Sequence, residues 1–268
     1  MMITRVGFGA WAIGGGDWAA GWGSQDDRAS VAAIRHAVER GLNWIDTAAV
    51  YGLGHSEKVV RQALAEIPVS QKPHVFTKCG MVWDEADRSR MPARIGAPDS
   101  IRRELDASLK RLGVERIDLY QMHWPAADGT PLESYWQTLL DLKAEGKVRA
   151  VGLSNHNAAQ LEICESIGHV DTLQPPFSAI RRNVATAELP WCRAHDTGVI
   201  VYSPMQSGLL TGRLTPARAA ALPTDDWRST NSEFSGDKLT RNLRLAAALE
   251  PIAARHRTSV AAVAVAWT

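Results

Sequence analysis

The sequence predicts an α/β fold in which strands and helices alternate to build a parallel sheet. Short apolar runs of strand length alternate with longer segments whose apolar residues recur at helical spacing. The composition shows no break along the chain, so we expect one domain over residues 1–268. Polar residues follow several of the short runs at their C-terminal ends. Alternation of this kind is typical of parallel sheets with right-handed crossovers.

The predicted strands are short apolar runs bounded by glycine, proline or polar residues. They cover residues 6–11, 43–46, 74–77, 117–122, 148–153, 172–174 and 198–202. The helices predicted from apolar spacing cover residues 26–40, 56–67, 98–112, 132–145, 157–167, 189–195, 241–255 and 259–267. Ser56 and Asn157 are predicted helix caps. Residues 83–97 and 203–236 are expected to be loops, and the second is long enough to be a lid or a binding loop.

The polar residues at the strand ends favour a closed barrel. They are Asp46, Lys78, His123, Asn155, Gln174 and Tyr202. In a (β/α)8 barrel these ends converge on one mouth, where active sites lie, whereas in an open sheet they spread along an edge. A barrel needs an eighth strand, which would follow the helix at residues 259–267. We therefore expect a (β/α)8 TIM barrel whose last strand and helix are missing from this sequence; an open doubly wound sheet and an incomplete barrel are the alternatives.

The composition excludes several classes of protein. Hydrophobic residues make up 45% and charged residues 22% of the chain, as in an ordinary globular protein. The formal net charge of +1 gives no basic surface for nucleic acid or an anionic membrane. The three cysteines show no CxxC spacing, which argues against a disulfide framework or a structural zinc site. No apolar run is long enough to span a bilayer, and we expect a cytoplasmic protein.

Three of the strand-end residues, Asp46, Lys78 and His123, form a plausible reaction site together with a fourth residue. This is Tyr51, which follows Asp46 by five residues. Tyr51 can act as an acid, but the pKa of an unperturbed phenol is about 10. The ammonium of Lys78 is expected to lower that pKa, and Asp46 to orient Lys78 through a charge-assisted hydrogen bond. His123 is expected to donate to a carbonyl oxygen. Each residue alone is more simply a cap, a solvated charge or a packing side chain, but their joint occurrence at strand ends predicts a site that polarises and protonates a carbonyl group.

A carbonyl that gains a proton must also gain an electron pair, and no side chain is a hydride donor. The residues therefore imply a nicotinamide cofactor. No Gly-x-Gly-x-x-Gly follows the first predicted strand, so another binding mode is expected. Ser154, Asn155 and Gln174 could hold the carboxamide, and Tyr202 could stack on the ring. Residues 203–209 offer hydroxyls and backbone N–H groups for a pyrophosphate.

Several motifs of the chain resemble those of the aldo-keto reductase family, and they occur in the family's order. The match is closest to the bacterial general-stress branch. The motifs are Gly9-Ala10-Trp11-Ala12-Ile13-Gly14-Gly15, Ile45-Asp46-Thr47-Ala48, Tyr51-Gly52, Ser56-Glu57, Thr77-Lys78, Ile117-Asp118-Leu119-Tyr120-Gln121-Met122-His123-Trp124-Pro125, Gly152-Leu153-Ser154-Asn155, Gln174-Pro175-Pro176-Phe177 and Tyr202-Ser203-Pro204 with Ser207-Gly208-Leu209-Leu210-Thr211-Gly212.

The resemblance implies a (β/α)8 barrel and NADPH-dependent reduction of aldehydes or ketones. It makes Tyr51 the proton donor, with Asp46, Lys78 and His123 completing a catalytic tetrad, and it implies no metal. The residues it implies for the cofactor are Trp11, Asp46, Ser154, Asn155, Gln174, Tyr202, Ser203, Pro204, Gln206, Ser207, Gly208 and Leu209. Those implied for the substrate are Trp11, Trp83, His123 and Trp124. It also implies that the last strand and the basic residues for the adenosine 2′-phosphate lie beyond residue 268.

Two other functions stay open at this point. A catalytically weak homologue that senses the cofactor or binds a partner could keep the same residues. A metal-dependent hydrolase or lyase could use His123 and Asp46 as ligands, although few further ligands follow the predicted strands. The leading prediction is an enzyme that acts on a small carbonyl compound, with neither nucleic acid nor membrane as a partner.

Overall fold

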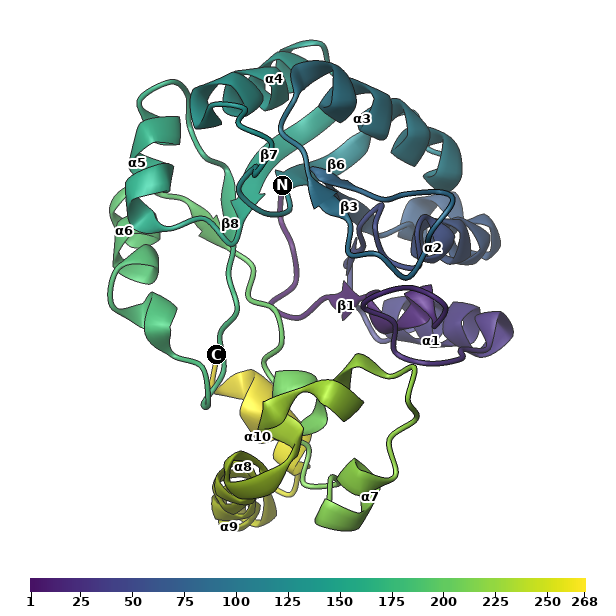
Figure 1. Cartoon of the computed structure of the whole chain (residues 1–268), viewed down its shortest axis with the longest axis vertical. Helices are drawn as coiled ribbons and strands as arrows, with labels where there is room; N and C mark the ends of the chain where they lie inside the picture. The colour runs from purple at the N-terminus through teal and green to yellow at the C-terminus, as the bar shows by residue number, and fades with distance from the viewer. The chain divides into compact units, whose positions relative to one another are not determined.

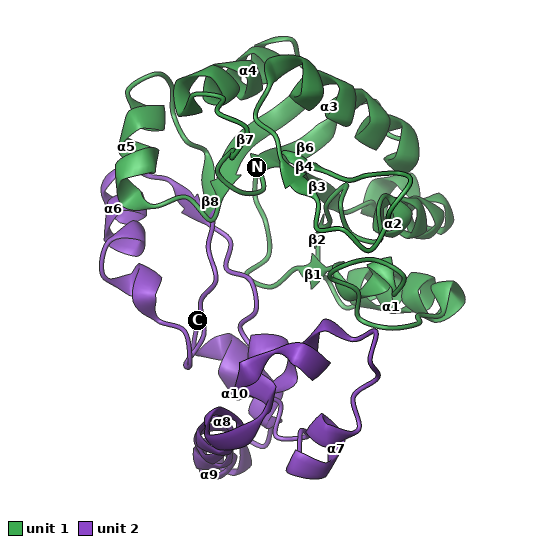
Figure 2. Cartoon of the chain, viewed as in Figure 1, with its two compact units in different colours: residues 1–173 green, residues 174–268 purple.

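The structure is a computed structural model that describes residues 1–268, and the chain divides into two compact units (Figure 1). Unit 1 comprises residues 1–173 and unit 2 comprises residues 174–268 (Figure 2). All four residues of the predicted tetrad belong to unit 1. The single domain expected from the composition stays a prediction, and the two units are described in turn.

Unit 1 is built on parallel strands. They are β1 (Phe8–Gly9), β2 (Trp44–Asp46), β3 (His74–Cys79), β6 (Ile117–Met122), β7 (Val148–Ser154) and β8 (Thr172–Gln174), the last of which ends at the unit boundary. The order of the strands is β1-β2-β3-β6-β7-β8-β9, and every pairing from β1 to β7 is parallel. The prediction of a parallel α/β sheet is therefore confirmed. Lys78 lies beside Gln121 in the register of β3 and β6.

The helices of unit 1 lie on one side of this sheet. They are α1 (Asp27–Glu39), α2 (His55–Glu66), α3 (Pro98–Leu112), α4 (Leu132–Ala144) and α5 (Ala158–Glu165). Figure 1 shows α2, α3 and α4 outside β3, β6 and β7. Their apolar faces are fully buried, as Leu105 of α3 and Trp136 of α4 illustrate. Because the helices cover the outer face, the polar side chains that close the strands are left to the inner face.

Of the two predicted helix caps, Asn157 agrees with the structure and Ser56 does not, and Asp26 is a further cap. Asp26 accepts from the backbone N–H of Ala29 at the start of α1. Asn157 forms a capping box with Gln160 at α5. The predicted cap Ser56 is wrong: α2 begins at His55 after Gly54, whose φ of 93° lies in the left-handed region. The Ser56 hydroxyl is used for tertiary contacts instead.

The predicted loop at residues 83–97 is partly a small hairpin. Strand β4 (Met81–Val82) pairs antiparallel with β5 (Ala93–Arg94). Strands of two residues leave no alternation to detect, so the sequence gives no signal for them.

Unit 2 is mostly helical after its first strand residues. It contains α6 (Glu188–Ala194), β9 (Gly198–Val199), α7 (Pro216–Ala220), α8 (Gly236–Ala248), α9 (Glu250–Arg255) and α10 (Val260–Ala266). The predicted loop at 203–236 holds α7 and three short 3-10 turns. The helix predicted over 241–255 starts earlier and divides at Leu249, because Pro251 stands in the first turn of α9 and interrupts the hydrogen-bond ladder.

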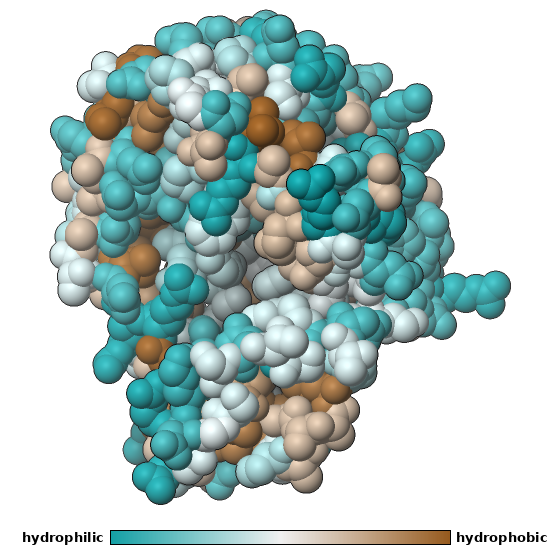
Figure 3. Space-filling model, in the orientation of Figure 1, coloured by the Kyte–Doolittle hydropathy of each residue, from teal (hydrophilic) through white to brown (hydrophobic).

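The face of the chain in Figure 3 is mainly hydrophilic, with hydrophobic residues in small separate patches. None of the helices has the length and apolar character that crossing a membrane requires.

Candidate active site

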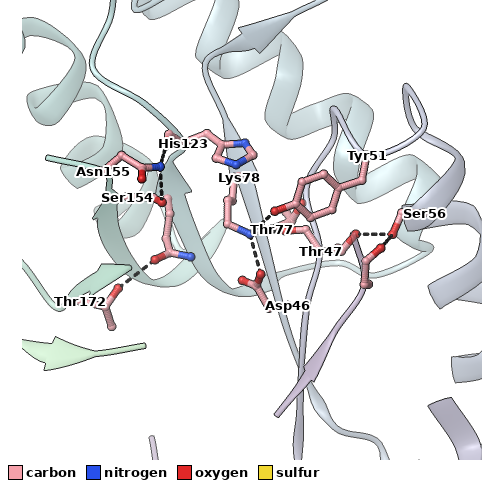
Figure 4. A network of polar contacts seen from close by, with 12 residues as sticks. Asp46, Thr47, Tyr51, Ser56, Thr77, Lys78, His123, Ser154, Asn155 and Thr172 are labelled. Atoms are coloured by element: carbon pink, nitrogen blue, oxygen red, sulfur yellow. Dashed lines mark hydrogen bonds and ion pairs between the residues drawn. The ribbon is translucent and has the colours of Figure 1, made fainter. Parts of the chain in front are cut away.

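The four residues of the predicted tetrad meet at one end of the unit 1 strands (Figure 4). Asp46 is the last residue of β2, and Lys78 is the last but one of β3. His123 directly follows β6, and Tyr51 lies in the turn between β2 and α2. Parallel strands bring these positions together, as the sequence predicted from their places at strand ends.

Lys78 is the centre of the group. Its Nζ donates to Asp46 Oδ2 at 2.7 Å, to the backbone carbonyl of Thr47 at 2.8 Å and to the Tyr51 hydroxyl at 3.4 Å. The Lys78 side chain is completely buried. A buried ammonium is stable only when it is paired and hydrogen-bonded, and these contacts supply both conditions.

The pKa of Tyr51 departs from the sequence-based expectation. Burial raises the pKa of the phenol well above its usual value, and the nearby Asp46 carboxylate raises it further. The net shift of the Tyr51 pKa is therefore upward, opposite to the lowering that the sequence analysis expected from Lys78. The Lys78 ammonium is paired with the Asp46 carboxylate at 2.7 Å, whereas the Tyr51 hydroxyl lies 3.4 Å from the same Nζ. The phenol is held protonated, which is the form that a proton donor needs.

His123 is a neutral imidazole beside the phenol. Burial lowers the pKa of His123 well below its usual range, and the positive charges of Lys78 and Arg94 lower it further. The ring stands edge-on to that of Tyr51, with ring centroids 5.6 Å apart and planes at 78°. Its Nδ1 is buried without a hydrogen-bond partner. A neutral imidazole has one N–H donor and no charge, which suits it to bind a carbonyl oxygen.

The backbone of the Tyr51 turn is fixed by a close approach to the loop after β1. Gly52 has a φ of 62°, and a Cβ at this position would lie 2.1 Å from the carbonyl oxygen of Gly14. A Cβ on Gly14 would lie 2.7 Å from the backbone nitrogen of Gly52. Only glycine fits at either position, so the two loops touch through their backbones.

Two of the three tryptophans predicted at the substrate mouth pack with the tetrad. Trp11 stacks on Tyr51 with ring centroids 6.1 Å apart, and Trp124 joins the same apolar cluster. Trp83 does not belong to this cluster. It lines a cavity of about 280 Å³ beside Glu104 and Arg111 of α3. The structure therefore places Trp11 and Trp124, but not Trp83, in the apolar cluster that contains Tyr51.

Ser154 and Asn155 close β7 next to His123. Ser154 is buried, and the Asn155 side-chain amide donates to its hydroxyl at 3.1 Å and to the backbone carbonyl of His123 at 3.0 Å. Asn155 has a φ of 63°, a left-handed conformation that asparagine tolerates better than most residues. This geometry ties the two residues expected to hold a carboxamide to the tetrad.

The remaining predicted cofactor residues lie in unit 2. Gln174 is buried at the end of β8, and the backbone of Tyr202 forms an isolated parallel bridge with Pro176. Ser203, Gln206 and Ser207 have φ values of 56°, 47° and 52°, and Gly208 follows at 105°. The predicted loop also includes Pro204 and Leu209, and Leu209 is fully buried. Strained non-glycine residues gathered in one loop are typical of ligand-binding segments, because the surrounding structure must enforce them.

Sequence reasoning missed the side chains that brace this loop. Arg228 donates to the carbonyl of Ser207 at 3.2 Å, and the buried Asp226 holds Arg228 at 2.6 Å. No motif marks this pair, because an arginine two residues after an aspartate is common in loops. The strained backbone of this loop is of the kind that a phosphate-bearing ligand requires.

The comparisons with known proteins agree with this chemistry. The family model "Aldo/keto reductase family" matches residues 5–268. The chain belongs to the aldo-keto reductase family. The "NADH-specific methylglyoxal reductase" of Escherichia coli (strain K12) is 35% identical over 280 residues, which cover 99% of this chain and 82% of that protein. "Aldo-keto reductase YhdN" of Bacillus subtilis (strain 168) is 32% identical over 265 residues, covering 98% of this chain and 77% of the relative.

A solved structure is also similar over most of its length. The glycerol dehydrogenase AKR11B4 from Gluconobacter oxydans is 40% identical, with a TM-score of 0.88 over 99% of this chain and 79% of that one. As an aldo-keto reductase, the chain is an oxidoreductase that uses a nicotinamide cofactor and acts on small carbonyl compounds. No group of three or more histidine, cysteine or carboxylate side chains is arranged to hold a metal ion.

Proposed function

We propose that this aldo-keto reductase reduces aldehydes or ketones to alcohols with NADPH, and that Tyr51 is the general acid. The observation that carries the proposal is the contact of 3.4 Å between Lys78 Nζ and the Tyr51 hydroxyl, in a buried site that also contains Asp46 and a neutral His123. A protonated phenol beside a buried ammonium can give up its proton and have the resulting charge stabilised.

Each residue has a distinct task in the proposed reaction. The reduced nicotinamide supplies a hydride to the carbonyl carbon when it is bound. Tyr51 gives its hydroxyl proton to the carbonyl oxygen, and Lys78 stabilises the phenolate that remains. Asp46 holds Lys78 charged and in place, and the His123 N–H binds and orients the carbonyl oxygen. General acid catalysis of this kind contributes about 10²–10⁴-fold to a rate.

The cofactor residues of the proposal come from both units. Ser154 and Asn155 of unit 1 and Gln174 of unit 2 would hold the carboxamide, Tyr202 would stack on the ring, and the strained loop at 203–209 would bind the pyrophosphate. NADPH is the cofactor that the sequence predicts, and the name of the E. coli relative makes NADH the alternative. A closed (β/α)8 barrel, with the cofactor and the substrate at its mouth, is part of the same proposal.

The substrate is proposed to be a small polar carbonyl compound. The names of two similar proteins, a methylglyoxal reductase and a glycerol dehydrogenase, support compounds of three carbons with oxygen on neighbouring atoms. Trp11 and Trp124 would supply the apolar walls that exclude water.

The decisive experiment is Tyr51→Phe. We expect turnover of a panel of small aldehydes and ketones to fall at least ~10²-fold, because the proton donor is lost, while cofactor binding measured by nicotinamide fluorescence stays within about twofold. Tyr120→Phe is the matched control, since Tyr120 is a fully buried tyrosine of β6 to which the proposed reaction gives no task, and it should keep its turnover. Retained turnover in Tyr51→Phe would refute the assigned acid. A wild type that binds the nucleotide but reduces no carbonyl would support the cofactor-sensing alternative.

A further inference from the structure

The first turn of α2 carries two buried polar residues, Ser56 and Glu57, to which the proposed reaction gives no task. Both are completely shielded from solvent. Burying a hydroxyl and a carboxylate costs free energy unless each finds partners, so their contacts show what they stabilise.

Ser56 connects the β2 end of the site with the loop after β1. Its hydroxyl lies 2.8 Å from the Thr47 hydroxyl and donates to the backbone carbonyl of Ala10 at 2.8 Å. Thr47 directly follows Asp46, and its carbonyl is one of the acceptors of Lys78. Ala10 directly precedes Trp11. Figure 4 shows Ser56 and Thr47 on the Tyr51 side of the tetrad.

Glu57 connects the same turn of helix with the strand that carries Lys78. One carboxylate oxygen accepts from the Thr77 hydroxyl at 2.7 Å, and Thr77 directly precedes Lys78. The other oxygen forms an ion pair with the Nε of Arg111 on α3. A buried carboxylate is costly without a counter-charge, and Arg111 supplies one whose side chain is itself 17% exposed. Arg111 is held in turn by the hydroxyl of Ser108 at 3.2 Å.

The two connections share one short piece of rigid backbone. Ser56 and Glu57 are consecutive residues of α2, and the backbone N–H of Ser56 donates to the carbonyl of Tyr51 at 3.1 Å. This single helical turn is therefore hydrogen-bonded to the residue after Asp46, to the residue before Lys78 and to Tyr51 itself. Three members of the tetrad, Asp46, Tyr51 and Lys78, are therefore held from one place, Asp46 and Lys78 through the residue beside each in the chain.

We propose that Ser56 and Glu57 are positioning residues of the tetrad, which set the 3.4 Å separation of Lys78 Nζ and the Tyr51 hydroxyl by holding strands β2 and β3 against the Tyr51 turn. This inference rests on the proposed function, because it assumes that Tyr51 gives the proton. When the link to Thr77 is cut, β3 loses its hydrogen bond to α2, and Lys78 is free to drift from the phenol. Misplacement of a reacting group by about 1 Å can cost about 10²-fold in rate.

The test uses threonine variants that keep the side-chain shape. Thr77→Val removes the hydroxyl that donates to Glu57, and Thr77→Ser keeps it. We expect Thr77→Val to lower kcat about 10- to 100-fold, with KM and the cofactor Kd within about twofold, and Thr77→Ser to stay within about threefold of wild type. The solvent deuterium isotope effect on kcat should rise in Thr77→Val, because proton transfer then limits the rate. Glu57→Gln should change kcat and the isotope effect in the same direction.

Thr138→Val is the matched control. Thr138 is a buried threonine of α4 whose hydroxyl donates to the carbonyl of Ser134 at 2.9 Å, far along the chain from the tetrad. It should lower the melting temperature without changing kcat or the isotope effect. If Thr77→Val lowers stability but leaves kcat and the isotope effect at wild-type values, Ser56 and Glu57 are structural only and the inference is wrong. Tyr51→Phe in the same assay separates the two proposals, because its retained activity would overturn the proposed function itself.

Discussion

At the scale of single residues, the site depends on how one buried charge is neutralised. The ammonium of Lys78 is completely buried and forms an ion pair with the carboxylate of Asp46 at 2.7 Å. The same carboxylate raises the pKa of Tyr51. Asp46 therefore stabilises the fold around Lys78 and keeps the phenol protonated, so the two effects share one residue.

Asp46→Asn should separate shape from charge at this position. The amide keeps the size of the side chain but leaves the Lys78 ammonium buried without its counter-charge, which costs about 3–5 kcal/mol when a buried pair is broken. We expect the free energy of unfolding in urea to fall by about that amount, and kcat to fall at least ~10-fold. The control is Asp84→Asn, which breaks an exposed pair with Arg90 at 3.4 Å and should cost less than about 1 kcal/mol. Equal stability of the two variants would contradict the role given to Asp46.

The residue types of the tetrad could be predicted from the sequence, but their electrostatics could not. Asp46, Tyr51, Lys78 and His123 stand out because each follows a predicted strand. The pKa of Tyr51 is raised by burial first and then by the Asp46 carboxylate. Neither the burial of the phenol nor its distance from this carboxylate can be read from a sequence. The surroundings of Trp83 could not be predicted for a similar reason, since the β4–β5 hairpin that carries it has strands too short to predict.

At the scale of elements, a buried histidine links the end of β7 to α4. The ring of His156 lies 2.8 Å from the carbonyl of Ser154 through Nδ1 and 2.7 Å from the Tyr135 hydroxyl through Nε2. A carbonyl can only accept, so Nδ1 carries the proton and Nε2 accepts from the tyrosine. Burial lowers the pKa of His156 to about 4. The histidine is thus a neutral connector between a strand and a helix.

This connector makes the stability of the protein depend on pH. The unfolded histidine has a pKa of about 6.5 and the folded one a pKa of about 4, so between these values the unfolded chain binds more protons. Stability is complete above about pH 6.5 and falls as the pH drops toward 4, by about 3 kcal/mol in all. Urea unfolding at a series of pH values measures the loss.

His156→Gln should remove this part of the pH dependence, whereas His36→Gln should keep it, because His36 is an exposed residue of α1 whose side chain is 74% accessible. An unchanged slope of stability against pH in His156→Gln would show that other groups are responsible.

The bounds of helices and strands could be predicted where apolar residues recur at regular spacing. They were mispredicted where tertiary contacts determine the start of a helix. The strands β3 and β6 and the helices α3 and α5 agree closely with the sequence prediction because their apolar residues repeat over several turns or pleats. The start of α2 was mispredicted because Ser56, a residue type that favours caps, turns inward to Thr47 and Ala10. A hydroxyl used in the core looks the same in a sequence as one that caps a helix.

At the scale of the whole molecule, the chain joins a unit that carries the four residues of the tetrad to a unit that carries the strained loop. The parallel sheet and the family are established, whereas a closed barrel and the preference for NADPH remain proposals. The sequence predicted the class of fold because the alternation of strands and helices extends over residues 6–202. It did not predict the division at residue 173, because no change of composition marks it.

The cofactor preference can be measured on the entire chain. We expect a titration monitored by nicotinamide fluorescence to give a lower Kd for NADPH than for NADH, as the resemblance to the family implies. The same titration of Arg218→Gln, an exposed arginine that contacts only the backbone of Arg213, should leave the ratio unchanged. Tighter binding of NADH would contradict NADPH as the cofactor and align the chain with the name of its E. coli relative.

The contact between Gly14 and Gly52 limits how this enzyme can be redesigned. Neither position accepts a side chain, so a mutant library that randomises the two loops as blocks will consist mostly of misfolded members. A search for new substrate ranges should leave both glycines untouched and vary the neighbouring indoles of Trp11 and Trp124. The backbone around Tyr51, the proposed proton donor, would then stay unchanged while the side chains that pack against it are varied.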